Sequence, residues 1–315
     1  MTRIAAVFPG QGSQSPGMLS ALAADWPQVR ETFAEASELL GEDLWQIAQD
    51  NPDDRLNQTR YTQPAMLAAG VAAARVWEAA GGPAPSMAAG HSLGEYSALV
   101  LAGVLDFGTG VQLVAERARL MQEAVPAGEG GMAAILGLDD DRVAEVCESV
   151  PGEGVVEPVN YNAPGQVVIA GDAGAVAAAV DAARAAGAKR AVTLPVSVPS
   201  HSSLMRPAAD ALADALASAD VRPPRLPVIH NVDARTRDEP DAIRDALRRQ
   251  LYNPVRWTDS VAALQADGAT LLLELGPGKV LTGLARRIDR ALSAVAVEDP
   301  ETLHKALAAA SGGSA

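Results

Sequence analysis

The segment Gly90-His91-Ser92-Leu93-Gly94 contains the pattern Gly-x-Ser-x-Gly, the strongest sign of chemistry in this sequence. An apolar stretch at 86–90 precedes it, and a helical pattern follows. The two glycines permit a sharp strand-to-helix turn that raises the Ser92 hydroxyl above a sheet edge and lets the Leu93 N–H face an oxyanion. The alternative is a glycine-rich turn with an incidental serine. The strand–turn–helix context favours a nucleophile at Ser92.

A serine nucleophile needs a base, and the chain offers four histidines. His91 adjoins the nucleophile, but its side chain should diverge from that of Ser92. His230 is expected in the core face of a strand, and His304 is expected to face water. His201 lies between a strand and a helix, where the catalytic groups of open α/β sheets gather. Elimination therefore favours His201 as the base, with a helix-capping or surface role as the alternative.

A carboxylate usually orients such a histidine, but no acidic residue has a context that nominates it. Gln250 offers another route. The helix expected at 241–251 must stop near Asn253-Pro254, so Gln250 lies in its last turn, where carbonyls lack intrahelical partners. This carbonyl could accept the imidazole N–H of His201 and favour the imidazolium. The alternative is an exposed surface glutamine.

Arg117 falls on the apolar side of the helix expected at 111–124, between Leu113 and Met121. A buried guanidinium without an anion is costly, so Arg117 must meet a carboxylate. That carboxylate could belong to the protein or to a ligand. The sequence pattern alone leaves both possibilities open.

The loop at 8–14, Phe-Pro-Gly-Gln-Gly-Ser-Gln, follows the first expected strand. Gly12 and Gly17 have the spacing of a phosphate-binding loop, but Met18-Leu19 replaces the Lys-Ser/Thr that such a loop requires. A dinucleotide-binding reading fails too, because the third glycine is missing. Exposed N–H groups beside the nucleophile would instead suit an oxyanion hole, with Gln11 as the second donor.

Composition restricts the class of protein. The 315 residues are 48% hydrophobic with a net charge of −14, which argues against disorder and against a general nucleic-acid binder. Cys147 is the only cysteine, so neither an internal disulfide nor a cysteine-rich metal site is expected. No signal peptide or membrane-spanning stretch is expected either. These features predict a cytoplasmic protein that does not bind membranes or metal.

Apolar runs alternate with helical patterns, which predicts an α/β fold. Strands of the larger part are expected at 4–8, 87–90, 192–198, 226–232 and 270–275, and helices include 63–80 and 111–124. The region 127–197 has the order β-α-β-β-α-β, typical of a ferredoxin-like unit. We therefore expect a small ferredoxin-like domain at 127–197 inserted into a larger domain formed by 1–126 and 198–315. A cleft between the two would be a natural ligand site.

These motifs together resemble those of bacterial malonyl-CoA:acyl carrier protein transacylases. The resemblance spans nearly the whole chain, and its segments are Phe-Pro-Gly-Gln-Gly-Ser-Gln (8–14), Gly-His-Ser-Leu-Gly-Glu-Tyr (90–96), Asn-Tyr-Asn-Ala-Pro-Gly-Gln (160–166), Val-Pro-Ser-His (198–201) and Glu-Leu-Gly-Pro-Gly-Lys-Val-Leu (274–281). It implies an α/β-hydrolase-like large domain with a ferredoxin-like insert. It also implies ping-pong transfer of malonyl from coenzyme A to the phosphopantetheine thiol of acyl carrier protein, in fatty acid synthesis and with no bound cofactor.

The resemblance also implies roles for single residues. Ser92 would be the nucleophile and His201 the base, oriented by the backbone carbonyl of Gln250. The N–H groups of Gln11 and Leu93 would form the oxyanion hole. Arg117 would bind the malonyl carboxylate, and Asn162 would line the pocket.

Three other functions remain open. Polyketide acyltransferases often carry Phe where this chain has Ser200, which favours the fatty acid enzyme but leaves a freestanding polyketide-type acyltransferase as an alternative. A serine acyl hydrolase would use the Ser92–His201 pair with water, and the discriminating features are Arg117 and the missing acidic third member. A non-catalytic module that binds the carrier is disfavoured by the retained serine, histidine and oxyanion loop. A monomer whose partners are acyl carrier protein and a coenzyme A thioester is expected.

Overall fold

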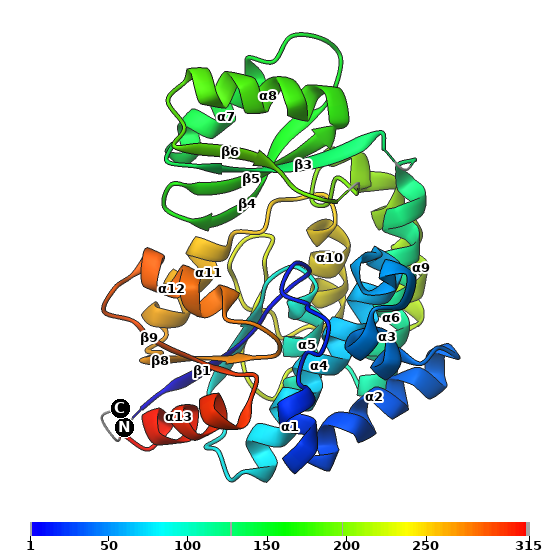
Figure 1. Cartoon of the computed structure of the whole chain (residues 1–315), viewed down its shortest axis with the longest axis vertical. Coiled ribbons are helices and arrows are strands. Elements are labelled where there is room, and N and C mark those ends of the chain that lie inside the picture. Colours follow the sequence, from blue (N-terminus) through cyan, green and yellow to red (C-terminus); the bar gives the residue numbers. More distant parts are fainter. Residues whose placement is uncertain (1, 127, 197, 313–315) are drawn as a thin grey trace.

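The structure is a computed structural model that describes every residue except 1, 127, 197 and 313–315. It is a mixed α/β fold with two separate sheets (Figure 1). The larger sheet is parallel, with the strand order β7-β2-β1-β8-β9. Its strands are β1 (Ile4–Phe8), β2 (Met87–Gly90), β7 (Val228–Ile229), β8 (Leu271–Leu275) and β9 (Ser293–Val297).

Both faces of the larger sheet are buried, as parallel sheets require. Along β1, the side chains of Ile4, Ala6 and Phe8 join one hydrophobic cluster, whereas Ala5 and Val7 join another. The alternation follows from the two-residue period of a strand. Two helices, α11 (Trp257–Ala266) and α12 (Val280–Ile288), cover the second face.

The remaining helices of the larger part contribute to the first cluster. They are α1 (Ser20–Asp25), α2 (Pro27–Leu40), α3 (Leu44–Asp50), α4 (Thr59–Ala79), α5 (Gly94–Leu101), α6 (Phe107–Ala124), α9 (Arg206–Ser218), α10 (Pro240–Gln250) and α13 (Pro300–Ala310), with the short 3-10 helices η1 (Pro52–Asn57) and η2 (Ser203–Met205). Among the helices of the described residues, none has the length and apolar character needed to cross a bilayer.

The smaller sheet is antiparallel, with the strand order β4-β5-β3-β6. Its elements are β3 (Gly130–Leu136), α7 (Asp140–Glu148), β4 (Val156–Ala163), β5 (Gln166–Asp172), α8 (Ala173–Ala185) and β6 (Arg190–Thr193). The helices α7 and α8 pack on one face, as Figure 1 shows at the top of the molecule. The opposite face carries a smaller cluster that includes Met132 and Val159.

Several expected elements differ from the structure. The strand expected at 192–198 ends at Thr193, because Pro195 cannot donate to a ladder, and it pairs with β3 of the smaller sheet. Residue 197 of that range lies outside the described residues. The strand expected at 226–232 shrinks to Val228–Ile229. The strand β9 and the helices α1 to α3 were not anticipated. The alternating α/β pattern and the order of elements in the smaller part are as expected.

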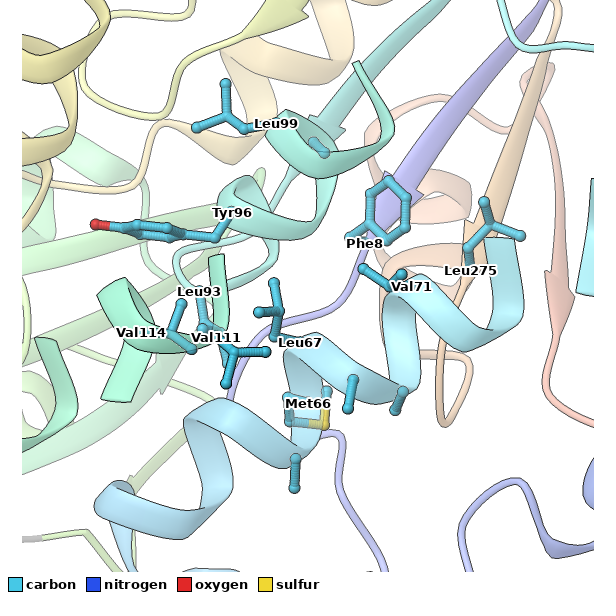
Figure 2. Packing of buried hydrophobic residues seen from close by; sticks show 14 of the residues in the cluster. Phe8, Met66, Leu67, Val71, Leu93, Tyr96, Leu99, Val111, Val114 and Leu275 are labelled. Carbon is cyan, nitrogen blue, oxygen red and sulfur yellow. The ribbon is translucent and has the colours of Figure 1, made fainter. Parts of the chain in front are cut away.

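The helix α4 holds the strand ends that carry the site. Figure 2 shows its residues Leu67 and Val71 packed beside Phe8 of β1 and Leu275 of β8. Gly70 permits this approach, since a Cβ there would meet the Ser97 hydroxyl at 3.0 Å and the Phe8 ring at 3.1 Å. The carboxyl ends of β1 and β2 and the start of α5 are therefore fixed against one core.

Candidate active site

Ser92 lies between β2 and α5 in a left-handed backbone conformation, with a φ of 52°. Its flanking glycines are sterically required. A Cβ on Gly90 would come within 1.9 Å of the Gly94 carbonyl carbon, and one on Gly94 within 2.1 Å of the Phe8 oxygen. A left-handed backbone at a residue other than glycine, as at Ser92, costs about 1–3 kcal/mol and persists only where neighbouring groups hold it in place. Here the Ser92 N–H donates to the Asn231 side-chain oxygen at 2.7 Å.

His201 faces Ser92 from the segment that precedes η2, and it too has a left-handed backbone, with a φ of 69°. Its Nε2 lies 2.7 Å from the Ser92 Oγ, and its Nδ1 lies 2.7 Å from the Gln250 carbonyl oxygen. A carbonyl only accepts hydrogen bonds, so Nδ1 carries the proton and Nε2 is left to accept from the Ser92 hydroxyl. The Gln250 carbonyl is available because α10 ends there.

Burial and the nearby positive charge of Arg117 together lower the pKa of His201 to about 3, although the Gln250 carbonyl acts to raise it. The carbonyl thus favours the imidazolium, as expected, but it does not decide the protonation state of the ring. Desolvation of a fully buried ring outweighs one hydrogen bond. His201 is therefore neutral near neutral pH and ready to accept a proton.

Arg117, on α6, is buried with 1% of its surface exposed. One terminal nitrogen donates to the Gln63 side-chain oxygen at 2.7 Å. The other donates to the Gln250 side-chain oxygen at 3.1 Å and lies 3.3 Å from the Ser92 Oγ. Among the described residues, Arg117 forms no ion pair with a carboxylate, and its Nε has no hydrogen-bond partner. The guanidinium is held by the neutral amide oxygens of Gln63 and Gln250, and no carboxylate among the described residues contacts it directly.

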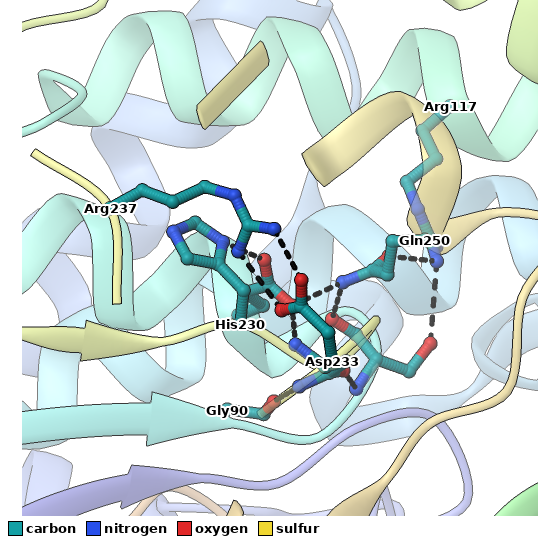
Figure 3. A network of polar contacts seen from close by, with 9 residues as sticks. Gly90, Arg117, His230, Asp233, Arg237 and Gln250 are labelled. Atoms are coloured by element: carbon teal, nitrogen blue, oxygen red, sulfur yellow. Dashed lines mark hydrogen bonds and ion pairs between the residues drawn. The ribbon is translucent and has the colours of Figure 1, made fainter. Parts of the chain in front are cut away.

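Glu95 belongs to a buried polar network next to Ser92, and Figure 3 labels the network members His230, Gln250 and Arg117. Its carboxylate lies 2.7 Å from the His230 Nδ1 and accepts the Asn231 N–H at 2.9 Å. It also accepts from the Gln250 side-chain nitrogen at 2.8 Å. That nitrogen lies 3.0 Å from the Ser92 carbonyl oxygen as well. The Gln250 side chain therefore joins Glu95, Ser92 and Arg117, while its main chain holds the base.

Sequence reasoning missed Glu95, Asn231 and Gln63, and it underrated Gln250. Their contacts join residues that lie 54 to 158 positions apart in the chain, so no local pattern reveals them. One signal was available for Glu95. It is the only charged residue of the otherwise apolar helix Gly94–Leu101, and the same argument had singled out Arg117.

A cavity of about 510 Å³ opens over Ser92. Its lining from the larger part includes Gln11, Leu93, Arg117 and His201. The smaller part contributes Met132, Asn160, Leu194 and Val196, together with Pro195. The expected oxyanion donors thus lie at the cavity beside the serine. In the described part of the chain, the N–H groups of Gln11 and Leu93 donate to no other group.

Asn162 lies apart from that lining. Its side-chain oxygen is 2.7 Å from the His91 Nε2, and the His91 ring packs against Trp257 with 5.6 Å between ring centroids. Burial lowers the pKa of His91. Asn162 therefore links β4 to the nucleophile loop, while Asn160, two residues earlier, reaches the cavity. His230 and His304 are buried and exposed, respectively, as expected.

Within the described residues, no group of three or more His, Cys, Asp or Glu side chains could hold a metal ion. The polar groups at the cavity include a serine, a neutral histidine, a guanidinium and two backbone N–H groups, with further polar side chains such as Asp54, Asn57 and Asn160 in the lining. This set can activate a hydroxyl, stabilise an oxyanion and bind a carboxylate.

Residues 6–299 match the family model of the acyl transferase domain. The chain is 58% identical over 307 residues to the malonyl CoA-acyl carrier protein transacylase of Escherichia coli (strain K12), covering 98% of this chain and 99% of that one. The chain belongs to the malonyl CoA-acyl carrier protein transacylase family. The Bacillus subtilis (strain 168) member of this family is 45% identical over 308 residues, with 98% of this chain and 97% of that one covered.

Solved structures of the transacylase family agree with this fold. An acyl carrier protein S-malonyltransferase from Vibrio cholerae superposes with a TM-score of 0.93 at 56% identity, covering 96% of this chain and 99% of that one. A malonyl-transacylase solved in complex with a type II polyketide synthase acyl carrier protein gives 0.95 at 56% identity, with coverages of 97% and 99%.

Proposed function

We propose that this protein transfers malonyl from malonyl-CoA to the phosphopantetheine thiol of acyl carrier protein, for fatty acid synthesis, through a covalent intermediate on Ser92. One observation carries the proposal. The Ser92 Oγ lies 2.7 Å from a neutral histidine nitrogen and 3.3 Å from a buried guanidinium, at the floor of one cavity. A nucleophile, a base and an anion site thus converge where a short acyl group carrying a carboxylate would fit.

In the acylation step, the His201 Nε2 takes the Ser92 proton while the Oγ attacks the thioester carbonyl carbon. The carbonyl π electrons move to oxygen, and the N–H groups of Gln11 and Leu93 stabilise that oxyanion. When the tetrahedral intermediate collapses, the C–S bond breaks and His201 gives its proton to the departing coenzyme A sulfur. The phosphopantetheine thiol then attacks the Ser92 ester by the same route in reverse, and the serine is restored.

Arg117 selects the acyl group in this proposal. Its planar fork can pair with a malonyl carboxylate through two parallel hydrogen bonds. A neutral acetyl group would leave that charge without an added partner. Binding the carboxylate also places the thioester carbon next to the Ser92 Oγ, because the same guanidinium touches both.

The finer description of the fold belongs to the proposal as well. We assign residues 127–197 to a ferredoxin-like domain inserted into an α/β-hydrolase-like catalytic domain at 1–126 and 198–315. The four-stranded antiparallel sheet and its β-α-β-β-α-β order support the first assignment. The strand-to-helix turn at Ser92 supports the second. The monomeric, cytoplasmic state and the absence of a cofactor stay predictions.

The complex of a 56% identical transacylase with a polyketide carrier favours a second candidate function. The same Ser92 chemistry would then supply malonyl to a polyketide carrier. The reaction is unchanged, and only the protein that presents the thiol differs.

The proposed function is tested by measuring transfer of malonyl to the carrier protein. The enzyme is mixed with malonyl-CoA and a phosphopantetheinylated carrier of either type, and the intact mass of the carrier is followed. We expect one malonyl group on the carrier and none on the carrier without phosphopantetheine. Free malonate with an unmodified carrier would instead show a hydrolase. The ratio of rates with the two carriers decides between the candidates.

A further inference from the structure

Arg117 and Glu95 are both buried charges, and one amide group separates them. The side-chain oxygen of Gln250 accepts from Arg117 at 3.1 Å, and its nitrogen donates to Glu95 at 2.8 Å. Glu95 is 0% exposed and Arg117 is 1% exposed, so water screens neither charge. A buried cation needs a compensating anion, yet no carboxylate among the described residues touches Arg117.

We propose that Glu95 is the counter-charge of Arg117, acting through the Gln250 side chain, and that it thereby sets how strongly the cavity holds an acyl carboxylate. The inference rests on the proposed function, and it adds a specificity-determining residue that does not line the cavity. A direct ion pair would occupy the guanidinium fork. The intervening amide keeps the anion close but leaves the Arg117 Nε without a partner in the described chain.

The surroundings of Glu95 support a negative charge there. Three N–H donors point at its two oxygens, from His230, Asn231 and Gln250. The Nε2 of His230 is buried with no partner in the described chain, so a proton on that nitrogen would have no acceptor, and His230 meets Glu95 through its Nδ1. The Tyr96 ring, 5.8 Å from the Arg117 Cζ, adds a weaker cation–π contact.

Glu95→Gln removes the charge with little change of shape. The glutamine oxygen can accept from Asn231 and Gln250, and its nitrogen can donate to the His230 Nδ1 once that ring carries its proton on Nε2. That proton then has no acceptor among the described residues, but this cost is common to proteins with Arg or Met at 117, so comparison of the two backgrounds subtracts it. Glu123→Gln, on an exposed position of α6, is the control for net charge.

The first readout is the thermal unfolding midpoint of Glu95→Gln, Arg117→Met and the double variant. We expect Glu95→Gln to lower the midpoint by at least about 2 °C more when Arg117 is present than when it is Met. A Glu95→Gln protein that fails to fold and is rescued by Arg117→Met gives the same answer. Equal losses in both backgrounds, or failure in both, would overturn the proposal and leave Glu95 a scaffold residue.

The second readout is kinetic. Without Glu95, the substrate carboxylate becomes the only anion near Arg117, so the KM for malonyl-CoA should fall by roughly tenfold. The kcat/KM for acetyl-CoA should stay within about threefold, and Glu123→Gln should change neither. An unchanged or higher KM for malonyl-CoA, or parallel changes for both substrates, contradicts the proposal. If the wild-type protein transfers no malonyl, the proposed function fails, while the unfolding cycle still tests the charge pair.

Discussion

The floor and the wall of the cavity are built differently. The floor belongs to the larger part of the molecule, and the polar groups in and behind it are buried. Gln250, behind the lining at the end of α10, contacts four other residues. The wall contributed by the smaller part presents mainly apolar side chains, such as Met132 and Leu194, with Asn160 as a polar exception. We infer from the difference that chemistry and acyl selection depend on the floor, whereas the wall shapes access. Substitutions in the floor should therefore cost much more.

The largest change is expected for Arg117→Ala. The ratio of kcat/KM for malonyl-CoA to that for acetyl-CoA should fall by up to about 10⁴-fold, because the carboxylate loses its partner. The matched control is Arg119→Ala on the same helix, whose guanidinium is exposed and pairs with Glu116 and Glu123. Competition between the two thioesters measures the ratio. An unchanged ratio in a folded Arg117→Ala protein would show that Arg117 does not select the acyl group.

His201→Ala should slow acylation of the enzyme by roughly 10²- to 10⁴-fold, the usual effect of losing a general base. Rapid-quench measurement of enzyme-bound malonyl gives the rate. His304→Ala, on an exposed position of α13, should leave that rate unchanged. A loss of less than about threefold for His201→Ala would mean that another group takes the serine proton.

The pH dependence of the acylation rate distinguishes a buried His201 from a solvent-exposed histidine. Because burial lowers the pKa of His201 from 6.5 to about 3, acylation by the neutral ester p-nitrophenyl acetate should hold as pH falls below 6.5 and decline only toward pH 3. Removing the Arg117 charge raises that pKa, so Arg117→Ala should move the decline to higher pH. A decline of the acylation rate centred near pH 6.5 in the wild-type protein would contradict the burial of His201 away from water.

The same shift affects stability. Between pH 6.5 and about 3, the unfolded chain binds a proton at His201 that the folded protein does not. The contribution of this histidine to the free energy of unfolding is thus fully present above pH 6.5 and is lost as pH falls through that window. Urea unfolding of wild type and His201→Ala at several pH values isolates it.

Leu194→Ala tests the wall and carries the smallest expected effect. The half-buried side chain lies beside Met132, so its loss should change kcat/KM for malonyl-CoA by less than about fivefold. The malonyl-to-acetyl ratio should not change. A loss as large as that of Arg117→Ala would show that the wall also positions the acyl group.

The sequence could predict features that depend on neighbouring residues, but not contacts between distant parts of the chain. The turn at Ser92 follows from two glycines within five residues, and Arg117 stands out because it breaks an apolar helix face. Both signals are local. Glu95 contacts Asn231 and Gln250, which lie 136 and 155 residues further along the chain, and only the folded structure brings these residues together. The edge strand β9 was missed because Ser293–Val297 is short and only partly buried.

The central claim is that Ser92 carries malonyl. The most direct measurement is the intact mass of the protein after mixing with malonyl-CoA and no carrier, followed by peptide mapping of the adduct. The account predicts one malonyl group, located on the peptide that contains Ser92, and none on Ser92→Ala. Equal labelling of the Ser92→Ala protein, or an adduct on any other residue, would contradict it.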